Sequence, residues 1–206
     1  MKLHDISMEV SEDVQVYKNK EEKKAKLVQQ YDFNNSSVYE TQLTMNLHTG
    51  THIDAPLHAI ENGETTETYS LDHFFGSCLV LDFMAVDEKI TAKDLEEYTI
   101  KEDTFIVLKT KNSLDEAFNY EFIYLEESGA KYLAEAKIKG VGIDGLGIER
   151  NQSGHPTHKI LLKNKIPILE GLRLKDIKEG YYEIAAFPIK IKDVEASPVR
   201  AVLIER

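Results

Sequence analysis

Three of the seven histidines of this chain lie within eleven residues, in the segment HTGTHIDAPLH (residues 48–58). The segment contains His48, His52 and His58, together with Asp54. An even spread of seven histidines over 206 residues would place fewer than one in a window of this length. Imidazole and carboxylate groups together are typical ligands of Zn²⁺, with Mn²⁺ and Fe²⁺ as alternatives. We interpret the segment as a metal centre, against the alternative of unrelated histidines on a surface loop.

The backbone of this segment must bend if its side chains are to share a metal. His48 and His52 are four residues apart, as in helical zinc sites, but Gly50 and Pro56 both oppose a helix. In a straight strand four residues cover about 13 Å, whereas two ring nitrogens on one zinc lie at most about 4 Å apart. We expect Gly50 to provide a bend and Pro56 a turn that brings His58 back to the site.

Further ligands must come from other parts of the chain. Asp54 has two carboxylate oxygens and can bridge two cations, so a site with two metal ions is chemically possible. Glu170 directly follows the apolar run IPIL (166–169), where a buried carboxylate would be costly without a cation, although a glutamate facing water fits the same pattern. The remaining histidines are His4, His73, His155 and His158. For Thr51 and Asp144 we expect structural hydrogen bonds, and an orienting role of Asp144 toward a ligand histidine is the less favoured alternative.

Strands outnumber helices among the elements that must position these residues. The apolar patterns predict strands over 41–48, 78–84, 105–110 and 140–144, after Pro167, and over 187–191; they predict helices over 91–98 and 125–136 and from 158. Because helices fall between some of the strands, we expect a mixed α/β fold with a strand-rich core, in a single domain spanning residues 1–206. The charge run KNKEEKKAK (18–26) predicts a solvated surface segment.

Composition excludes several classes of partner. The net charge of −11 opposes binding to nucleic acid or to an anionic membrane. No apolar run approaches the roughly 20 residues of a membrane span, and MKLHDISMEV is unlike a secretion signal, so we expect a cytoplasmic protein. Cys78 is the only cysteine, and its apolar surroundings predict a buried, inert thiol.

The chain resembles the metal-dependent cyclase-type hydrolase family that includes bacterial kynurenine formamidase. The signature H-x-G-T-H-x-D-x-P-x-H, which reads THIDAPLH over residues 51–58, is highly specific to that family. The resemblance extends along most of the chain, through HDIS (4–7), GID (142–144), HKILL to ILE (158–170), GYYE (180–183) and ASPVRAVL (196–203). It implies a three-layer β/β/α fold of the swivelling type and a homodimer.

The resemblance also implies a role for each site residue. His48, His52 and Asp54 would bind one metal; Asp54, His158 and Glu170 would bind a second, with Asp54 bridging. His58 would be the catalytic acid and base. The implied cofactor is Zn²⁺, two per chain, with Mn²⁺ as the alternative. The implied partner is a small-molecule amide, with N-formylkynurenine hydrolysed to kynurenine and formate through a metal-activated water.

Two alternatives remain beside the formamidase. One is a related hydrolase of a cyclic amide or ester, such as an isatin-type lactam. The other is a structural zinc site in a non-catalytic binding protein, which the single cysteine and the spare histidine oppose, since structural zinc is normally closed by four protein ligands. Two segments depart from the family's sequence. VQVYKNKEEKK (14–24) lacks its tryptophan; Tyr17 is a candidate replacement in the pocket, but an ordinary half-buried tyrosine is the favoured interpretation. Gly147 and Glu149 stand where a serine and an aspartate are common.

Overall fold

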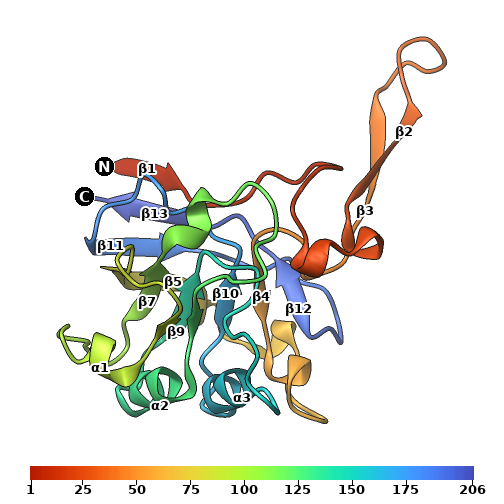
Figure 1. Ribbon diagram of the computed structural model, residues 1–206. Helices are drawn as coiled ribbons and strands as arrows, with labels where there is room; N and C mark the ends of the chain where they lie inside the picture. The colour runs from red at the N-terminus through yellow and green to blue at the C-terminus, as the bar shows by residue number, and fades with distance from the viewer.

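A curled nine-stranded sheet forms the centre of the molecule in the computed structural model, which describes residues 1–206 (Figure 1). The strands in its order are β1 (Lys2–Asp5), β13 (Val202–Glu205), β11 (Gly180–Ala185), β5 (Phe75–Asp82), β7 (Phe105–Lys109), β9 (Gly140–Ile143), β10 (Ile168–Glu170), β4 (His52–Asp54) and β12 (Ala196–Pro198). Two small sheets pair β2 (Lys26–Tyr31) with β3 (Glu40–Thr44) and β6 (Lys89–Ile90) with β8 (Tyr124–Leu125). The α-helices are α1 (Ala92–Leu95), α2 (Glu127–Glu135) and α3 (Pro156–Lys163).

Parallel pairing is confined to the middle of the large sheet. β5, β7, β9 and β10 run parallel to one another, and the strands outside them pair antiparallel. Parallel strands are covered on both faces and therefore appear in the sequence as continuous apolar runs, as in FIVLK of β7, which is buried at every residue. The helices α2 and α3 precede β9 and β10, the connections that parallel strands require.

Two apolar clusters lie on the two faces of this sheet. One packs the sheet against the helices and includes Leu108, Leu133 and Leu161. The other lies on the opposite face, inside the curl, and includes Ile53 and Leu203 from strands at opposite ends of the strand order. A strand layer therefore folds over the inner cluster while helices cover the outer one (Figure 1). The expected mixed α/β fold with a strand-rich core is confirmed.

Local sequence signals correctly predicted several of the elements. Thr91 and Asp94 form the capping box that opens α1, with Thr91 N–H donating to Asp94 Oδ2 at 2.7 Å. Helix α3 ends at Lys163, and strand β10 follows Pro167, as expected. Asp144, directly after β9, accepts hydrogen bonds from Thr110 and Ser113 and from no histidine, so the structural expectation for it is confirmed.

The strand predicted over residues 187–191 is wrong. Strand β11 ends at Ala185, and beyond it only an isolated bridge joins Pro188 to Val199. Proline has no N–H to donate to a ladder, so the alternation of Phe187, Ile189 and Ile191 does not continue the sheet. The exposed Phe187 instead stacks on Phe75, with ring centroids 6.4 Å apart.

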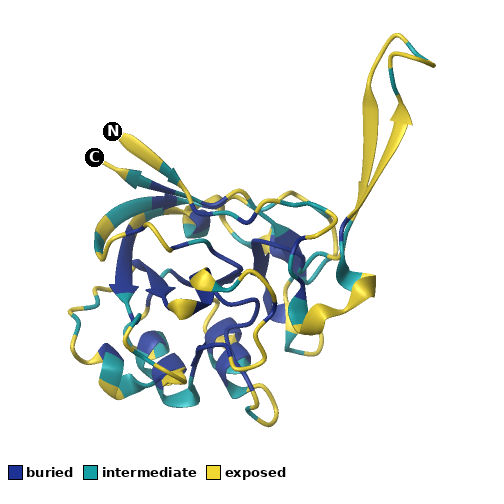
Figure 2. Ribbon diagram, turned by 45° about the horizontal axis from the view of Figure 1, so that its top comes forward, coloured by how far each residue is buried: buried dark blue, intermediate teal, exposed yellow.

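The hairpin β2–β3 projects from the body as an arm (Figure 1). Every residue of both strands is exposed, as Figure 2 shows in yellow. The arm nevertheless contains seven of the seventeen exposed large hydrophobic residues of the chain: Leu27, Val28, Tyr31, Phe33, Val38, Tyr39 and Leu43. A two-stranded hairpin is at best marginally stable alone in water, so this surface is an unusual one for an isolated chain.

Two further expectations concern single features. Cys78 is fully buried, and burial raises the pKa of its thiol, so the prediction of an inert cysteine is confirmed. None of the helices is both long enough and apolar enough to span a membrane.

Candidate metal centre

Strand β4 presents two of the candidate ligands on one face. Side chains alternate along a strand, so His52 and Asp54 point to the site while Ile53 is buried in the inner apolar cluster. The chain bends before the strand at Gly50, which has a φ of +70°. The bend brings the ring of His48 to within 4.9 Å of the ring of His52, centroid to centroid. The predicted bend at Gly50 is confirmed.

Strand β10 and helix α3 bring the distant residues to the same place. β10 pairs antiparallel with β4, and the register sets Glu170 opposite His52. Thr51 holds the two segments together, because its hydroxyl donates to Gly171 O at 2.6 Å and accepts from Met8 N at 2.8 Å. Helix α3 contributes His158, whose Nε2 lies 3.6 Å from Glu170 Oε1.

The carboxylate of Asp54 lies at the centre of this cluster. Its Oδ1 is 3.0 Å from His48 Nδ1 and 3.5 Å from His52 Nε2, and its Oδ2 is 3.8 Å from His158 Nε2. His52 Nε2 is also 3.5 Å from Glu170 Oε2. The five residues predicted as metal ligands from the sequence therefore surround one small volume, and Asp54 contacts both sides of it.

Hydrogen bonds fix the orientation of two histidine rings. His52 Nδ1 lies 2.9 Å from Gly50 O, an acceptor, so Nδ1 donates and Nε2 is left facing the cluster. His158 Nδ1 is bound in the same way by Glu149, which also accepts from the backbone N–H groups of Thr157 and His158. A ring nitrogen held by a carboxylate or carbonyl is the usual arrangement behind a metal-binding histidine.

The close approach of carboxylates and imidazoles in the cluster shifts their pKa values. Although burial opposes ionisation, contacts with His158 and His52 hold the pKa of Glu170 well below its usual range. Burial likewise opposes the charged form of His158, but Glu149 and Glu170 raise its pKa to about 10. In the metal-free protein a proton on His158 therefore balances part of the negative charge that a cation would balance.

Three buried polar atoms of the cluster indicate whether its residues fit a metal. His52 Nε2 and both carboxylate oxygens of Asp54 are buried and have no hydrogen-bond partner. Buried polar atoms are nearly always paired, and these three are nitrogen and oxygen atoms of the kind that coordinate Zn²⁺. The residues present therefore fit a divalent metal.

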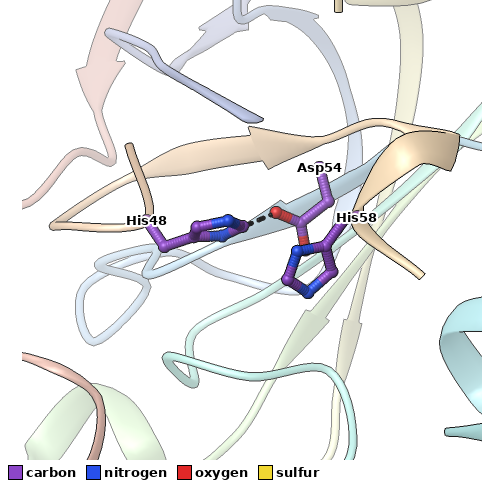
Figure 3. A group of neighbouring side chains, drawn as sticks. All are labelled: His48, Asp54 and His58. Carbon is purple, nitrogen blue, oxygen red and sulfur yellow. Dashed lines mark ion pairs between the residues drawn. The ribbon is translucent and has the colours of Figure 1, made fainter. Parts of the chain in front are cut away.

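His58 lies at the edge of the cluster, beside His48 and Asp54 (Figure 3). Pro56 opens the short 3-10 turn Pro56–His58, as predicted, and this turn returns His58 to within 4.4 Å of the His48 ring and 5.3 Å of the His158 ring, centroid to centroid. Loss of water around the ring lowers the pKa of His58, and His48 and His158 lower it further against the opposing effect of Asp54. A neutral imidazole at this position can accept a proton.

A cavity of about 530 Å³ opens onto the cluster. His48, His58, His158 and Glu170 line it, and Leu57, Ile60 and Leu146 supply apolar surface. Tyr17 also lines this cavity, beside Gly147, where an added Cβ would lie 3.3 Å from the Tyr17 ring. Tyr17 is half-buried, as the favoured interpretation expected, and its ring lines the pocket.

The sequence predictions missed four residues at the site. Glu149 is buried against His158; Glu195 lies 3.3 Å from His48 Nε2; and Lys23 and Lys159 line the cavity. Glu149 gave a signal, as a departure from the family's sequence. Lys23 lies in a charge run that predicts surface, and nothing in the sequence distinguishes Lys159 or Glu195. His155, which also lines the cavity, had no distinguishing spacing. The remaining histidines are away from the cluster: His4 pairs with Glu205, and His73 contacts Ser70.

Comparisons with known proteins identify the family of this chain. Residues 4–150 match the cyclase family, described as "Putative cyclase". Kynurenine formamidase of Erythrobacter litoralis is 34% identical over 171 residues, 82% of this chain and 79% of that protein. A structure described as a predicted metal-dependent hydrolase from Bacillus stearothermophilus superposes with a TM-score of 0.91 and 46% identity, covering 100% of this chain and 98% of the other.

A more distant structure shows how widely the fold is shared. Isatin hydrolase A from Labrenzia aggregata superposes with a TM-score of 0.86 at 21% identity, covering 100% of this chain and 94% of the other. At this identity the likeness concerns the fold alone. The match over residues 4–150 and the 34% identity to a kynurenine formamidase over 79% of its length establish that the chain belongs to the cyclase family of metal-dependent hydrolases.

Proposed function

We propose that the protein is a metal-dependent hydrolase of a small amide, with arylformamidase activity that converts N-formylkynurenine to kynurenine and formate. The observation that carries this proposal is the buried cluster around Asp54, whose unpaired atoms fit a divalent metal and which opens to a cavity of ligand size. The identity to a kynurenine formamidase along most of the chain supports the substrate class.

The ligands of the proposed centre are His48, His52, Asp54, His158 and Glu170. The first three would bind one Zn²⁺, and Asp54 would bridge to a second that His158 and Glu170 complete. A ligand set of histidines and carboxylates without cysteine is typical of catalytic zinc sites. Such sites keep one coordination position for water or substrate, whereas structural sites are closed by four protein ligands. When bound, the metal supplies Lewis acidity toward a carbonyl oxygen and lowers the pKa of a coordinated water.

The chain's own residues then supply the proton transfers. His58 takes a proton from the attacking water as the C–O bond forms at the formyl carbon, and it delivers that proton to the amide nitrogen as the C–N bond breaks. An amine is a poor leaving group until it is protonated, so this delivery is the essential step. Leu57, Ile60 and Leu146 limit water around the reacting groups.

One coupled experiment tests the proposal. The metal content of purified protein is measured, and hydrolysis of N-formylkynurenine is followed before and after treatment with a chelator and after metal repletion. We expect a stoichiometric metal and activity that disappears and returns with it. Metal without formamidase activity, but with turnover of isatin, would transfer the assignment to a cyclic-amide hydrolase. Absence of metal after repletion would contradict both the formamidase and the cyclic-amide hydrolase assignments.

Glu149 gives a prediction that concerns metal binding directly. The change Glu149→Gln is expected to weaken metal affinity by about 10- to 100-fold, the range for a carboxylate that orients a ligand histidine, because an amide accepts less strongly from His158 Nδ1. Competition with a chromogenic chelator measures the affinity. Glu61→Gln, at an exposed glutamate on the same cavity, is the control. Equal affinities for the two variants would refute the orienting role.

We also propose that the protein is a homodimer held by the β2–β3 arm. The arm's seven exposed large side chains are unexplained in a single chain, and contiguous exposed apolar surface commonly marks an interface. The base of the arm, at Ala25, is buried, so the hairpin starts from an anchored position.

The arm gives its own prediction. Phe33, 76% exposed, and Tyr39 lie at the far part of the hairpin with ring centroids 6.3 Å apart. Replacing both with serine is expected to raise the dimer dissociation constant by about 30-fold or more, as for aromatic hot spots, with an unchanged circular dichroism spectrum. Sedimentation velocity measures the mass, and Leu71→Ser, at a 63% exposed residue of the body, is the control. A monomeric wild type would rule out the dimer.

A further inference from the structure

Lys23 and Lys159 differ from the other shielded lysines of the chain. Five lysines are buried or half-buried. Three of them have a carboxylate partner: Lys24 pairs with Glu21, Lys109 with Asp82, and Lys139 with Asp103. Lys23 and Lys159 form no ion pair and donate no side-chain hydrogen bond, and both line the cavity of the metal centre.

The positions of these two lysines are fixed by the site itself. Thr49, within the metal-binding motif, donates its hydroxyl to Lys23 O at 2.6 Å, which ties the Lys23 segment to the motif. The Lys23 Nζ lies over the ring of Tyr17, 5.5 Å from its centroid, so the side chain packs along the cavity wall. Lys159 follows the ligand histidine His158 on helix α3.

Unpaired ammonium groups at this place need an explanation. Removing a charged group from part of its water is unfavourable unless an opposite charge or hydrogen-bond acceptor replaces the water. The chain has 36 acidic residues against 25 lysines and arginines, so carboxylate partners are not scarce. The cavity's own buried carboxylates are engaged, Glu149 by His158 and Glu170 by the N–H of Ile148. The missing partner is therefore one that enters the cavity.

We propose that Lys23 and Lys159 bind a carboxylate of the substrate, so that the enzyme selects amides bearing an anionic group apart from the scissile bond. This inference rests on the proposed amide hydrolysis for its substrate class. The carboxylate accepts hydrogen bonds from the two ammonium groups, while the amide lies at the metal centre beside His58. Charge-assisted hydrogen bonds of this kind give both affinity and orientation.

Two matched substrates test the proposal: N-formylkynurenine and its carboxamide, in which the carboxylate is replaced by an uncharged amide. With the wild type we expect a KM about tenfold or more lower for the carboxylate, the effect of one to two charge-assisted hydrogen bonds. Lys23→Met and Lys159→Met should each remove most of this preference, with little change in kcat. The KM for the carboxamide should remain within about twofold of the wild type.

Binding measurements separate this inference from the proposed function. Equilibrium dialysis compares binding of kynurenine and its carboxamide to the metal-free protein, with no need of turnover. Lys163→Met, at an exposed and unpaired lysine one turn further along α3, is the matched control and should retain the preference. No turnover of either formamide would refute the proposed function, whereas equal KM values, or equal binding of the two kynurenines, would refute the carboxylate site.

Discussion

Replacing His58 with alanine is expected to leave the metal content unchanged and to lower kcat for N-formylkynurenine by about two to four orders of magnitude, the range for a general acid and base. The ring lies 4.4 Å from that of His48 and lines the cavity, where it can reach both the attacking water and the leaving nitrogen. Its lowered pKa keeps it neutral near pH 7, as a proton acceptor must be. Steady-state kinetics and metal analysis of the same preparation measure the two effects.

The same variant distinguishes a proton carrier from a ligand. His58 could also form a metal site with His48 and Asp54, because their candidate ligand atoms lie close together. If His58 were a ligand, His58→Ala would lose metal and activity together. Because the ring of His58 lines the cavity, its removal leaves space there, and added imidazole should restore part of the activity of the variant. His73→Ala, at a histidine outside the cavity, should have neither effect.

The metal motif could be predicted because its constraints are local. Gly50 and Pro56 exclude a regular helix, and the short distance between ligands on one metal requires a bend, so sequence and elementary geometry gave the course of the backbone there. For Glu170 the apolar run before it left a buried carboxylate and a glutamate facing water equally open, and the family resemblance decided for a metal ligand. In the structure it is 4% exposed and opposite His52 in the sheet.

The other features could not be predicted from the sequence, because they depend on contacts between segments that are far apart in the chain. Lys23 belongs to a run of charges that resembles any solvated loop, and only the hydrogen bond from Thr49 places it beside the cavity. The role of Glu149 depends on the position of α3 relative to the loop after β9. The strand predicted over 187–191 failed for a related reason: the alternation of apolar residues was correct locally, but Pro188 prevents the ladder and the chain returns to the sheet only at β12.

The contacts of strand β4 separate the stability of the fold from the binding of metal. β4 is held by backbone pairing with β10 and β12, and the inner apolar cluster fixes Ile53 behind it. The ligand face of the strand, by contrast, has a side-chain hydrogen bond between His52 Nδ1 and Gly50 O but three buried polar atoms without hydrogen bonds. The fold should therefore persist without metal, while the ligands remain in position to bind it.

Asp54→Asn tests this separation of fold from metal binding. The metal-free variant should remain folded, because backbone pairing with β10 and β12 holds strand β4 and an amide keeps the shape of the carboxylate, although the 3.0 Å contact with His48 Nδ1 loses its charge. In the wild type, metal at about 1,000 times its dissociation constant should stabilise the native state by about 4 kcal/mol, which raises Tm by about 10 °C for a chain of this size. The variant should lose this shift and its activity, since the carboxylate that we propose as the bridging ligand is gone.

Differential scanning calorimetry of metal-free and metal-loaded protein measures the shift directly. Glu64→Gln is the control: its carboxylate pairs with Lys165 Nζ at 3.0 Å, is 51% exposed and contacts no residue of the buried cluster. That variant should keep both the shift and most of the activity. A metal-induced shift that survived in Asp54→Asn would show that the cation binds elsewhere, because a neutral amide at the centre of the cluster cannot replace the negative charge that a carboxylate offers to a cation.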